Sequence, residues 1–341
     1  MKWRTRAVTV VAFAYPLSLV VLALSLRYVG EQWWVTGVGL YLPRLVFAIP
    51  LPLVLLAIGL VRLYRLLWTQ VIAALVLLFP LMGLVPPRLA PRGREEGVLR
   101  VLSYNINAGA GGIEKVVDQI NEWSPDVVLL QEVASSETLR DLLGGRYATV
   151  QAAGQFFLAS RYPASTVEPS PLDYGGRPRS ARFVAQTLET PLGTIVVYNV
   201  HPISPREIFY ALRGSGLRTE LMSGRLFSPA NGAVFKTNSG LRALQVQTFA
   251  EAAKRESAPV IIAGDTNLPS LSYVLSRSLS AYRDGFTEVG SGFGYTYPTA
   301  GRPWMRIDRI LASEALRFVR FDVGSSLASD HLCVVADLER R

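Results

Sequence analysis

Eight polar side chains that can bind a metal ion or move a proton stand at or beside the ends of apolar, strand-like runs of the sequence or, for Asp308, inside one. They are Asn105, Glu132, His201, Asp265, Asn267, Asp308, Asp330 and His331. Taken singly, Glu132 is typical of an exposed acid after a strand, and Asp265 with Asn267 is typical of a turn. Both histidines of the chain belong to the set, however, and two histidines in matching positions with carboxylates nearby favour one shared active site.

The chemistry of this set is that of hard oxygen donors plus two imidazoles. Such donors favour Mg²⁺, Mn²⁺ or Ca²⁺ over zinc, and these ions commonly assist phosphoryl chemistry. The single cysteine, Cys333, excludes a disulfide framework and a multi-cysteine metal site. A phosphate-binding G-x-x-x-x-G-K motif and a G-x-S-x-G nucleophile motif are both absent from the sequence, so it does not favour ATP hydrolysis or serine-esterase chemistry.

The elements that must position these residues are short β-rich runs separated by turns and by two helical patterns. Apolar residues recur at helical spacing over 113–123 and 241–255. Several strands follow one another without a helix between them, which favours mixed sheets packed face to face with helices outside. The expected strands are 99–106, 127–131, 183–188, 194–199, 260–263, 306–311 and 333–338.

Seven short motifs, in this order, resemble the endonuclease/exonuclease/phosphatase superfamily, the fold of deoxyribonuclease I and the neutral sphingomyelinases. They are S-Y-N-I (103–106), L-L-Q-E-V (129–133), S-R-Y-P (160–163), N-V-H (199–201), A-G-D-T-N (263–267), R-I-D-R-I-L (306–311) and S-D-H (329–331). The resemblance covers residues 98–341. It implies a four-layer α/β sandwich with two central mixed sheets, and a phosphoester hydrolase that depends on Mg²⁺, with Mn²⁺ or Ca²⁺ as alternatives.

The resemblance also implies a role for each matched residue. It implies metal ligands at Asn105, Glu132 and Asp330, and catalytic residues at His201, Asp265, Asn267, Asp308 and His331. In this scheme Asp265 orients or deprotonates the attacking water, and Asn267 contacts the phosphate or the metal. His201 contacts the scissile phosphate or protonates the leaving group, and Asp308 orients His331. Arg161 is expected either to contact the substrate phosphate or to close a turn before Pro163.

The first 88 residues have the composition of a membrane anchor. Uncharged apolar stretches predict three spanning helices at about 7–26, 42–61 and 66–87, because about 20 helical residues cross a bilayer core. A cleaved signal peptide is the alternative for the first stretch, but its apolar part is longer than such peptides have. Trp33, Trp34 and Tyr41 suit an interfacial belt. Residues 89–97 read as a linker before the catalytic domain, 98–341.

The charge distribution supports this division. The net charge of +9 comes mainly from residues 1–97, with ten Lys or Arg and three Glu, whereas residues 98–341 have 25 Lys or Arg and 23 acids. Five basic residues lie on each side of the expected spans. Because the first helix usually sets orientation, we expect the catalytic domain to lie outside the cytoplasm, on an integral protein of the inner or plasma membrane.

These observations predict a membrane-anchored phosphodiesterase acting on a lipid headgroup or another membrane-proximal phosphoester. A membrane-tethered endo- or exonuclease is the alternative, although the nearly neutral catalytic domain does not favour nucleic acid as a partner. A non-catalytic membrane scaffold is a third possibility. The segment 206–236, which mixes basic and apolar residues, is either a peripheral insertion or an arm over the active site. The sequence does not indicate an oligomeric state.

Overall fold

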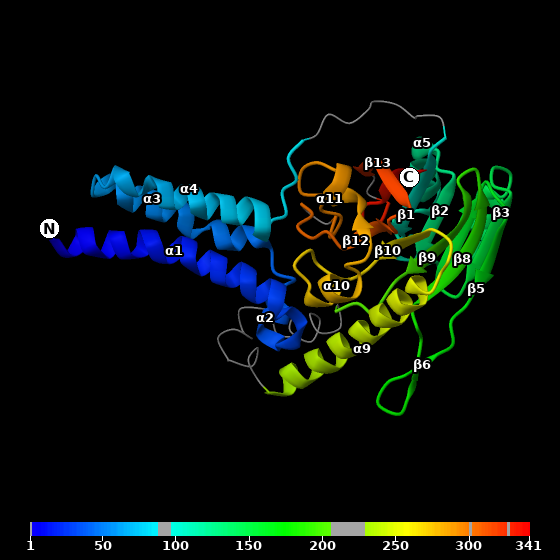
Figure 1. The fold of residues 1–341 in the computed structure, drawn as a ribbon, viewed down its shortest axis with the longest axis horizontal. Helices are drawn as coiled ribbons and strands as arrows, with labels where there is room; N and C mark the ends of the chain where they lie inside the picture. The colour runs from blue at the N-terminus through cyan, green and yellow to red at the C-terminus, as the bar shows by residue number, and fades with distance from the viewer. Residues whose placement is uncertain (1, 88–96, 206–228, 300–301, 326–327) are drawn as a thin grey trace.

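The computed structural model describes residues 2–87, 97–205, 229–299, 302–325 and 328–341. An α/β domain carries an elongated arm of N-terminal helices (Figure 1). The expected linker and most of segment 206–236 lie outside the described residues. We refer to residues 2–87 as the arm and to the described residues from 97 onward as the domain.

Two six-stranded mixed sheets form the centre of the domain, which confirms the expected α/β class with two mixed sheets. In order across the first sheet, the strands are β13 (Leu316–Val323), β14 (Val334–Arg340), β1 (Leu99–Asn105), β2 (Val127–Gln131), β4 (Phe156–Ser160) and β3 (Thr149–Ala153). The second sheet contains β11 (Arg283–Asp284), β12 (Asp308–Ala312), β10 (Val260–Asp265), β9 (Gly193–Val200), β8 (Phe183–Thr190) and β5 (Ala164–Val167). Each sheet has one parallel pair, β1 with β2 and β10 with β9. A small hairpin pairs β6 (Leu172–Asp173) with β7 (Pro178–Arg179).

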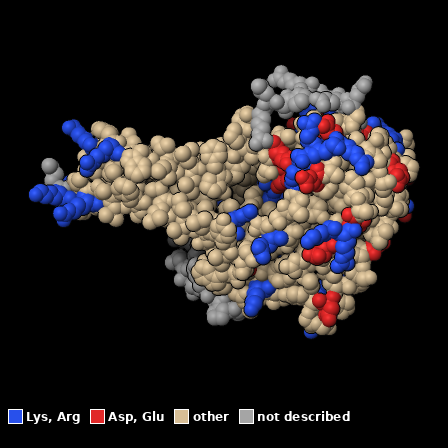
Figure 2. All heavy atoms as spheres, in the orientation of Figure 1, with Lys and Arg blue, Asp and Glu red and all other residues tan. Residues whose placement is uncertain are grey.

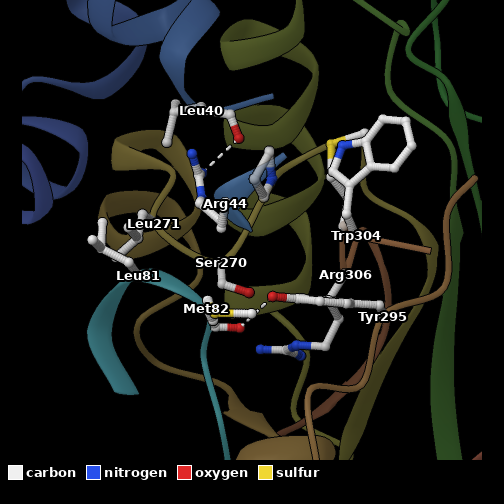
Figure 3. A pocket seen from close by; sticks show the side chains of 11 residues that line it. Leu40, Arg44, Leu81, Met82, Ser270, Leu271, Tyr295, Trp304 and Arg306 are labelled. Atoms are coloured by element: carbon white, nitrogen blue, oxygen red, sulfur yellow. Dashed lines mark hydrogen bonds between the residues drawn. The ribbon is translucent and has the colours of Figure 1, made fainter. Parts of the chain in front are cut away.

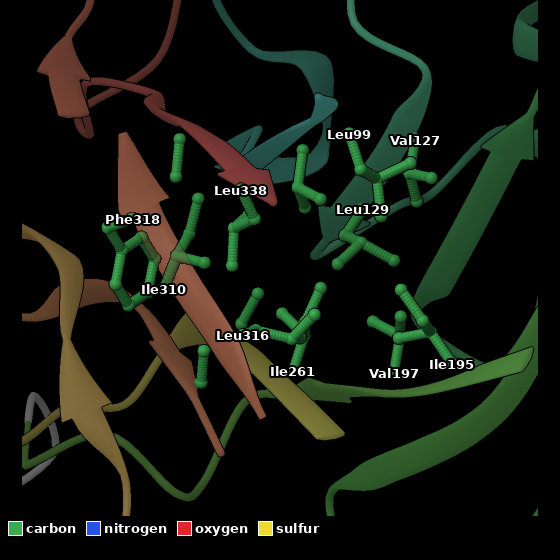
Figure 4. Close-up of a cluster of buried hydrophobic side chains, with 14 of the residues drawn as sticks. Leu99, Val127, Leu129, Ile195, Val197, Ile261, Ile310, Leu316, Phe318 and Leu338 are labelled. Carbon is green, nitrogen blue, oxygen red and sulfur yellow. The ribbon is translucent and has the colours of Figure 1, made fainter. Parts of the chain in front are cut away.

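The sheets pack face to face because their inner faces are apolar. Leu129, Val197 and Ile261 belong to one core between the sheets (Figure 4). A second core joins the first sheet to α5 (Ile113–Trp123) and α6 (Ser136–Leu143), and a third joins the second sheet to α9 (Pro229–Lys254) and α10 (Tyr273–Ser278). A short helix, α11 (Gly285–Val289), packs near β13. The burial of strands on both faces explains their nearly continuous apolar runs.

The sequence predicts the strands that carry the site more accurately than the peripheral ones. The expected strands correspond to β1, β2, β8, β9, β10, β12 and β14, and the helix expected over 113–123 is α5. The sequence pattern does not predict β3 (Thr149–Ala153), β4 (Phe156–Ser160), β5 (Ala164–Val167) or β13 (Leu316–Val323). The helix expected over 241–255 begins earlier, at Pro229, because its first turns pack on the arm: Phe235 is buried, and a Cβ on Gly37 would lie 2.2 Å from its ring.

The arm contains α1 (Lys2–Tyr28), α2 (Trp34–Gly39), α3 (Pro50–Leu60) and α4 (Leu67–Val76). Short helical turns, Gly30–Gln32, Arg44–Ala48, Tyr64–Leu66 and Leu77–Leu81, join or extend these helices. Two continuous helical segments, Lys2–Tyr28 and Tyr64–Leu81, are long and apolar enough to cross a membrane, and Arg44–Leu60 is a shorter apolar helix. The last helix ends at Leu81 instead of continuing to residue 87, because Val85 exchanges two backbone hydrogen bonds of 2.8 Å with Gly292 of the domain.

The arm packs directly against the domain. Tyr41, expected in an interfacial belt, is instead buried at this junction, with 5% of its surface exposed. A pocket at the junction is lined from both sides (Figure 3). Its lining includes Leu40, Arg44 and Met82 of the arm and Leu271, Tyr295 and Trp304 of the domain. We call this contact the junction.

Candidate active site

The strand ends named in the sequence analysis meet at one edge of the two packed sheets. In the first sheet, Asn105 at the end of β1 lies opposite Gln131, the residue before Glu132. In the second, Asp265 at the end of β10 lies opposite Asp308, the first residue of β12. Strand packing between the sheets brings these two pairs together, and the end of β9 adds His201.

Local backbone geometry turns the side chains into this edge. Glu132 and Asn267 have positive φ angles of 55° and 51°, unusual for residues other than glycine and typical of functional sites. Gly264 has a φ of 149°, and a Cβ there would lie 1.9 Å from the carbonyl oxygen of Val200. The A-G-D motif therefore requires glycine because β10 approaches β9 too closely for a side chain.

Asp265 is the centre of the site. Its Oδ2 accepts a hydrogen bond of 3.2 Å from Asn105 Nδ2 and lies 3.5 Å from His201 Nε2 and 3.7 Å from His331 Nε2. Its Oδ1 accepts from the backbone N–H of Asn267 at 2.9 Å. Glu132 completes the group, since its Oε1 accepts from Asn105 Nδ2 at 3.1 Å and lies 3.4 Å from His201 Nε2.

The electrostatics of this group favour proton transfer near neutral pH. His331 Nδ1 lies 2.9 and 3.1 Å from the two carboxylate oxygens of Asp308, and both residues are buried. Burial alone would lower the pKa of His331, but the carboxylates of Asp308 and Asp265 raise it to about 9. Burial raises the pKa of Asp265 to about 7, although the nearby His331 lowers it in part. A carboxylate that titrates near pH 7 is suited to accept a proton from water.

Two neighbours of the histidines are not predicted by the sequence. Gln155, between β3 and β4, places its Oε1 2.7 Å from His201 Nδ1, so it accepts a hydrogen bond from this nitrogen, and Nε2 faces Glu132 and Asp265. The ring of Tyr297 packs on His331, with 4.6 Å between the ring centroids. Neither residue belongs to a strand-end pattern, so the sequence carries no signal that would have found them.

Buried polar contacts also tie the two sheets together just beneath the site. Gln131 Nε2 donates to Asn199 Oδ1 at 2.8 Å, and Asn199 Nδ2 donates to the carbonyl of Leu130 at 3.2 Å. Ser329 Oγ donates to the carbonyl of Asn105 at 2.8 Å, which attaches the loop before His331 to the end of β1. Because buried polar groups are costly to leave unpaired, these bonds fix how the two sheets align at the site.

The remaining two predicted residues, Asp330 and Arg161, lie in different surroundings from each other. Asp330 is half-buried beside His331, and Ser329 Oγ lies 3.4 Å from its Oδ1. Arg161 lies at the opposite end of β2 from Glu132, where its guanidinium is 3.3 Å from Asp126 and its backbone N–H donates to the Asp126 carbonyl. This position fits the alternative of a turn before Pro163, and Arg161 is not brought to the site.

The donor set fits a hard divalent cation. Within the described parts of the chain, Asp265, Asp308 and His331 have ligand atoms within 4.8 Å of one another. This trio differs from the expected ligands, and its His331 Nδ1 is already bonded to Asp308. The Glu132 side chain is 28% exposed against 2% for Asp265, so Glu132 offers a carboxylate that an ion can reach. The carboxylate oxygens of Glu132 and Asp265 are donors of the kind that Mg²⁺ prefers. Asn105 faces them through Nδ2, and its Oδ1 accepts a hydrogen bond of 3.0 Å from the backbone N–H of Asn107.

A reachable carboxylate beside two imidazoles, at the edge of two packed mixed sheets, is an arrangement suited to metal-dependent phosphoester hydrolysis. Residues 102–331 match the model of the Endonuclease/Exonuclease/phosphatase family. The chain therefore belongs to this family, whose members are metal-dependent phosphoester hydrolases. The enzyme class expected from the sequence is thereby confirmed.

Several solved structures are similar to this chain. An endonuclease/exonuclease/phosphatase from Beutenbergia cavernae is 20% identical, with 72% of each chain covered and a TM-score of 0.49. TDP2 from Caenorhabditis elegans is 19% identical, with 71% of this chain and 74% of that chain covered and a TM-score of 0.50. TDP2 from D. rerio, complexed with a single-strand DNA product, is 16% identical, with 71% of this chain and 99% of that chain covered and a TM-score of 0.46. At these identities the likeness concerns the fold alone. No curated protein matches the chain.

Proposed function

We propose that this protein is a membrane-anchored phosphodiesterase that hydrolyses a lipid headgroup or another membrane-proximal phosphoester. The observation that carries the proposal is the convergence of Asn105, Glu132, His201 and His331 around the buried carboxylate of Asp265. A scaffold without catalytic activity would have no need of this arrangement, because clustered buried polar groups cost stability.

Glu132 and Asn105 are the proposed principal metal ligands, with Asp330 as the residue that closes the site. When bound, Mg²⁺ would polarise a phosphoryl oxygen and stabilise the leaving oxygen. Mn²⁺ and Ca²⁺ are alternatives with the same preference for oxygen donors.

The proposed roles of the other residues follow from their contacts. Asp265, with its pKa near neutral, orients the attacking water and accepts its proton. His331, held by Asp308, contributes a positive charge that offsets the charge developing on the phosphoryl group. His201, held through Nδ1 by Gln155, directs Nε2 toward the scissile phosphate and protonates the leaving group. Asn267 is proposed to contact the phosphate or the metal.

Surface chemistry supports a membrane anchor made of the apolar helical segments of the arm, Lys2–Tyr28, Arg44–Leu60 and Tyr64–Leu81. Among the described residues, all the large exposed hydrophobic side chains except Leu142, Val167 and Val234 lie between Trp3 and Phe79. On the face shown in Figure 2, charged side chains are almost absent between the far end of the arm and the domain. An apolar surface of this extent would be unfavourable in water and is suited to lipid.

The charges at the end of the arm support an extracytoplasmic domain. Lys and Arg side chains gather at the end of the arm that is farthest from the domain (Figure 2). Residues 2–6 contribute Lys2, Arg4 and Arg6, and the turn between α3 and α4 contributes Arg62 and Arg65. On the domain side, Arg44 is buried and is not a free flanking charge. By the positive-inside rule, the far end lies in the cytoplasm.

A substrate panel tests the proposed function. Purified full-length protein would be given lysophospholipid, phospholipid, sphingomyelin, phosphoinositide and single-stranded DNA, each with Mg²⁺ and with excess EDTA. We expect Mg²⁺-dependent release of product from a lipid class. DNA hydrolysis that falls steeply with salt would instead support the nuclease alternative, because phosphate contacts release counterions. Absence of hydrolysis on every substrate would contradict the proposal and favour the scaffold.

A further inference from the structure

A tyrosine of the arm reaches the loop that carries the active-site residues Asp265 and Asn267. Tyr41, which follows α2, donates a hydrogen bond of 2.9 Å from its hydroxyl to the backbone carbonyl of Asn267. Both residues are buried, Tyr41 at 5% exposed and Asn267 at 4%. This bond joins residues 226 positions apart in the sequence, so it exists only because the arm packs on the domain.

Asn267 is a residue whose backbone needs external support. Its φ of 51° lies in the left-handed region, which is unfavourable for a residue with a Cβ. The surrounding bonds hold it there: its N–H donates to Asp265 Oδ1 at 2.9 Å, and its Nδ2 donates to the carbonyl of Pro202 at 3.0 Å. The Tyr41 hydroxyl adds the bond to its carbonyl. These bonds connect the loop after β10 to the loop after β9.

The ring of Tyr41 is fixed by the same region. The Arg242 guanidinium carbon lies 5.8 Å from the centre of the Tyr41 ring, and Arg242 donates to the carbonyl of Ile203 at 2.9 Å. Trp304 Nε1 lies 3.4 Å from the Tyr41 carbonyl oxygen. Tyr41 is therefore in contact with elements next to His201, through Arg242, and next to Asp265, through Asn267.

A second arm residue supports the same loop from its other end. Glu31 is 7% exposed, and its carboxylate accepts hydrogen bonds from the backbone N–H groups of Tyr273 at 3.0 Å and Val274 at 3.4 Å, and from the Ser272 hydroxyl. These residues begin α10, which follows the Asn267 loop. The arm thus binds the segment 267–274 at both ends.

We propose that Tyr41 is a positioning residue of the active site, which holds Asn267 in its left-handed conformation and thereby fixes the Asp265 carboxylate. The arm would then be a structural part of the catalytic site in addition to a tether. The inference rests on the proposed function, because it assigns Tyr41 a role in the hydrolysis carried out at that site.

The substitution Tyr41→Phe tests this inference in the full-length protein, because it keeps the ring and removes only the hydroxyl. Loss of one buried hydrogen bond changes a local equilibrium by about three- to tenfold. We expect kcat for bis(p-nitrophenyl) phosphate with Mn²⁺ to fall by about this factor, with KM within about twofold, because the bond orients catalytic groups and does not contact substrate.

Tyr295→Phe is a matched control. Tyr295 donates a hydrogen bond of the same length, 2.9 Å, across the same junction, but its hydroxyl bonds to the carbonyl of Met82 in the arm and not to that of Asn267 (Figure 3). We expect this variant to keep the kcat of the unmodified protein within about twofold, while its melting temperature falls as much as that of Tyr41→Phe. An equal loss of kcat in both variants would mean that Tyr41 acts only by stabilising the junction, and would overturn the inference.

Amide hydrogen exchange gives a readout that does not depend on activity. Tyr41→Phe should speed exchange in a peptide covering 264–274 by about three- to tenfold, and Tyr295→Phe should leave that peptide unchanged. Unchanged exchange and kcat in Tyr41→Phe would overturn the inference. If the unmodified protein hydrolyses no phosphoester, the proposed function fails, whereas the exchange result still decides whether Tyr41 holds the loop.

Discussion

Replacing Asp308 by Asn should shift the titration of His331, because Asp308 is the carboxylate bonded to its Nδ1. The pKa of His331 is raised from an ordinary value of 6.5 to about 9, a difference worth about 3 kcal/mol. Asp308 is the largest of the charges that raise it, and Asp265 contributes next. In Asp308→Asn, burial opposes only the remaining charges, so the pKa of His331 should fall from about 9 toward its ordinary value.

The same shift predicts how stability depends on pH. Since the folded-state pKa is above the unfolded one, the stabilisation from His331 is complete below pH 6.5 and is lost as the pH rises through about 9. Asp308→Asn should therefore destabilise the protein at pH 6 and make its stability vary less between pH 6.5 and 9.

Nuclear magnetic resonance of a histidine-labelled sample measures this pKa directly, because the chain contains two histidines and gives two ring signals. A His201→Gln sample assigns them, and EDTA keeps the protein free of metal. A pKa of His331 near 6.5 in the unmodified protein would refute the conclusion that Asp308 raises it. The same raised pKa in Asp308→Asn would refute it as well.

Three further predictions follow from the site and the anchor. His201→Ala should reduce turnover of the natural substrate by about 10²–10⁴-fold, and a substrate with a nitrophenyl leaving group should partly restore the rate, because that leaving group needs little protonation. Near-normal turnover of the natural substrate would assign His201 a structural role. Gly264→Ala should destabilise the domain by about 3 kcal/mol or more, because the new Cβ would lie 1.9 Å from the carbonyl oxygen of Val200. An unchanged melting temperature would contradict the close approach of β10 to β9. A cysteine at exposed Glu137 should react with an impermeant thiol reagent in intact cells or spheroplasts, and labelling only after permeabilisation would reverse the proposed orientation.

The sequence identifies the residues of the site where strand ends determine their position. Asn105, Glu132 and Asp265 could be predicted as site residues because each ends an apolar run, and Asp308 because it is an acid inside one. Their proximity follows from the pairing of β1 with β2 and of β10 with β12. Arg161 belongs to an equally regular motif, S-R-Y-P, yet it follows the strand β4, which runs antiparallel to β2, so it lies at the other end of the sheet.

Contacts between distant segments could not be predicted in this way. Gln155 reaches His201 from a hairpin of strands that the sequence analysis did not identify, and a single glutamine carries no periodic signal. Tyr41 has the composition expected of a membrane interface, but its position depends on how the arm packs on the domain. Such contacts are set by the tertiary arrangement, which neither propensity nor spacing determines.

The most direct test of the central claim measures how much hydrolysis added metal restores after EDTA treatment. It compares Glu132→Gln with Glu137→Gln as the control variant. Both variants replace a glutamate by its amide, but Glu137 is exposed in the first turn of α6, whereas Glu132 bonds to Asn105 in the site. After EDTA treatment, added Mg²⁺ or Mn²⁺ should restore phosphodiester hydrolysis in the unmodified protein and in Glu137→Gln. Glu132→Gln should remain at least about 10²-fold slower, with an unchanged melting temperature in the absence of metal. Full activity in excess EDTA, or full restoration in Glu132→Gln, would contradict a metal-dependent hydrolase built on Glu132.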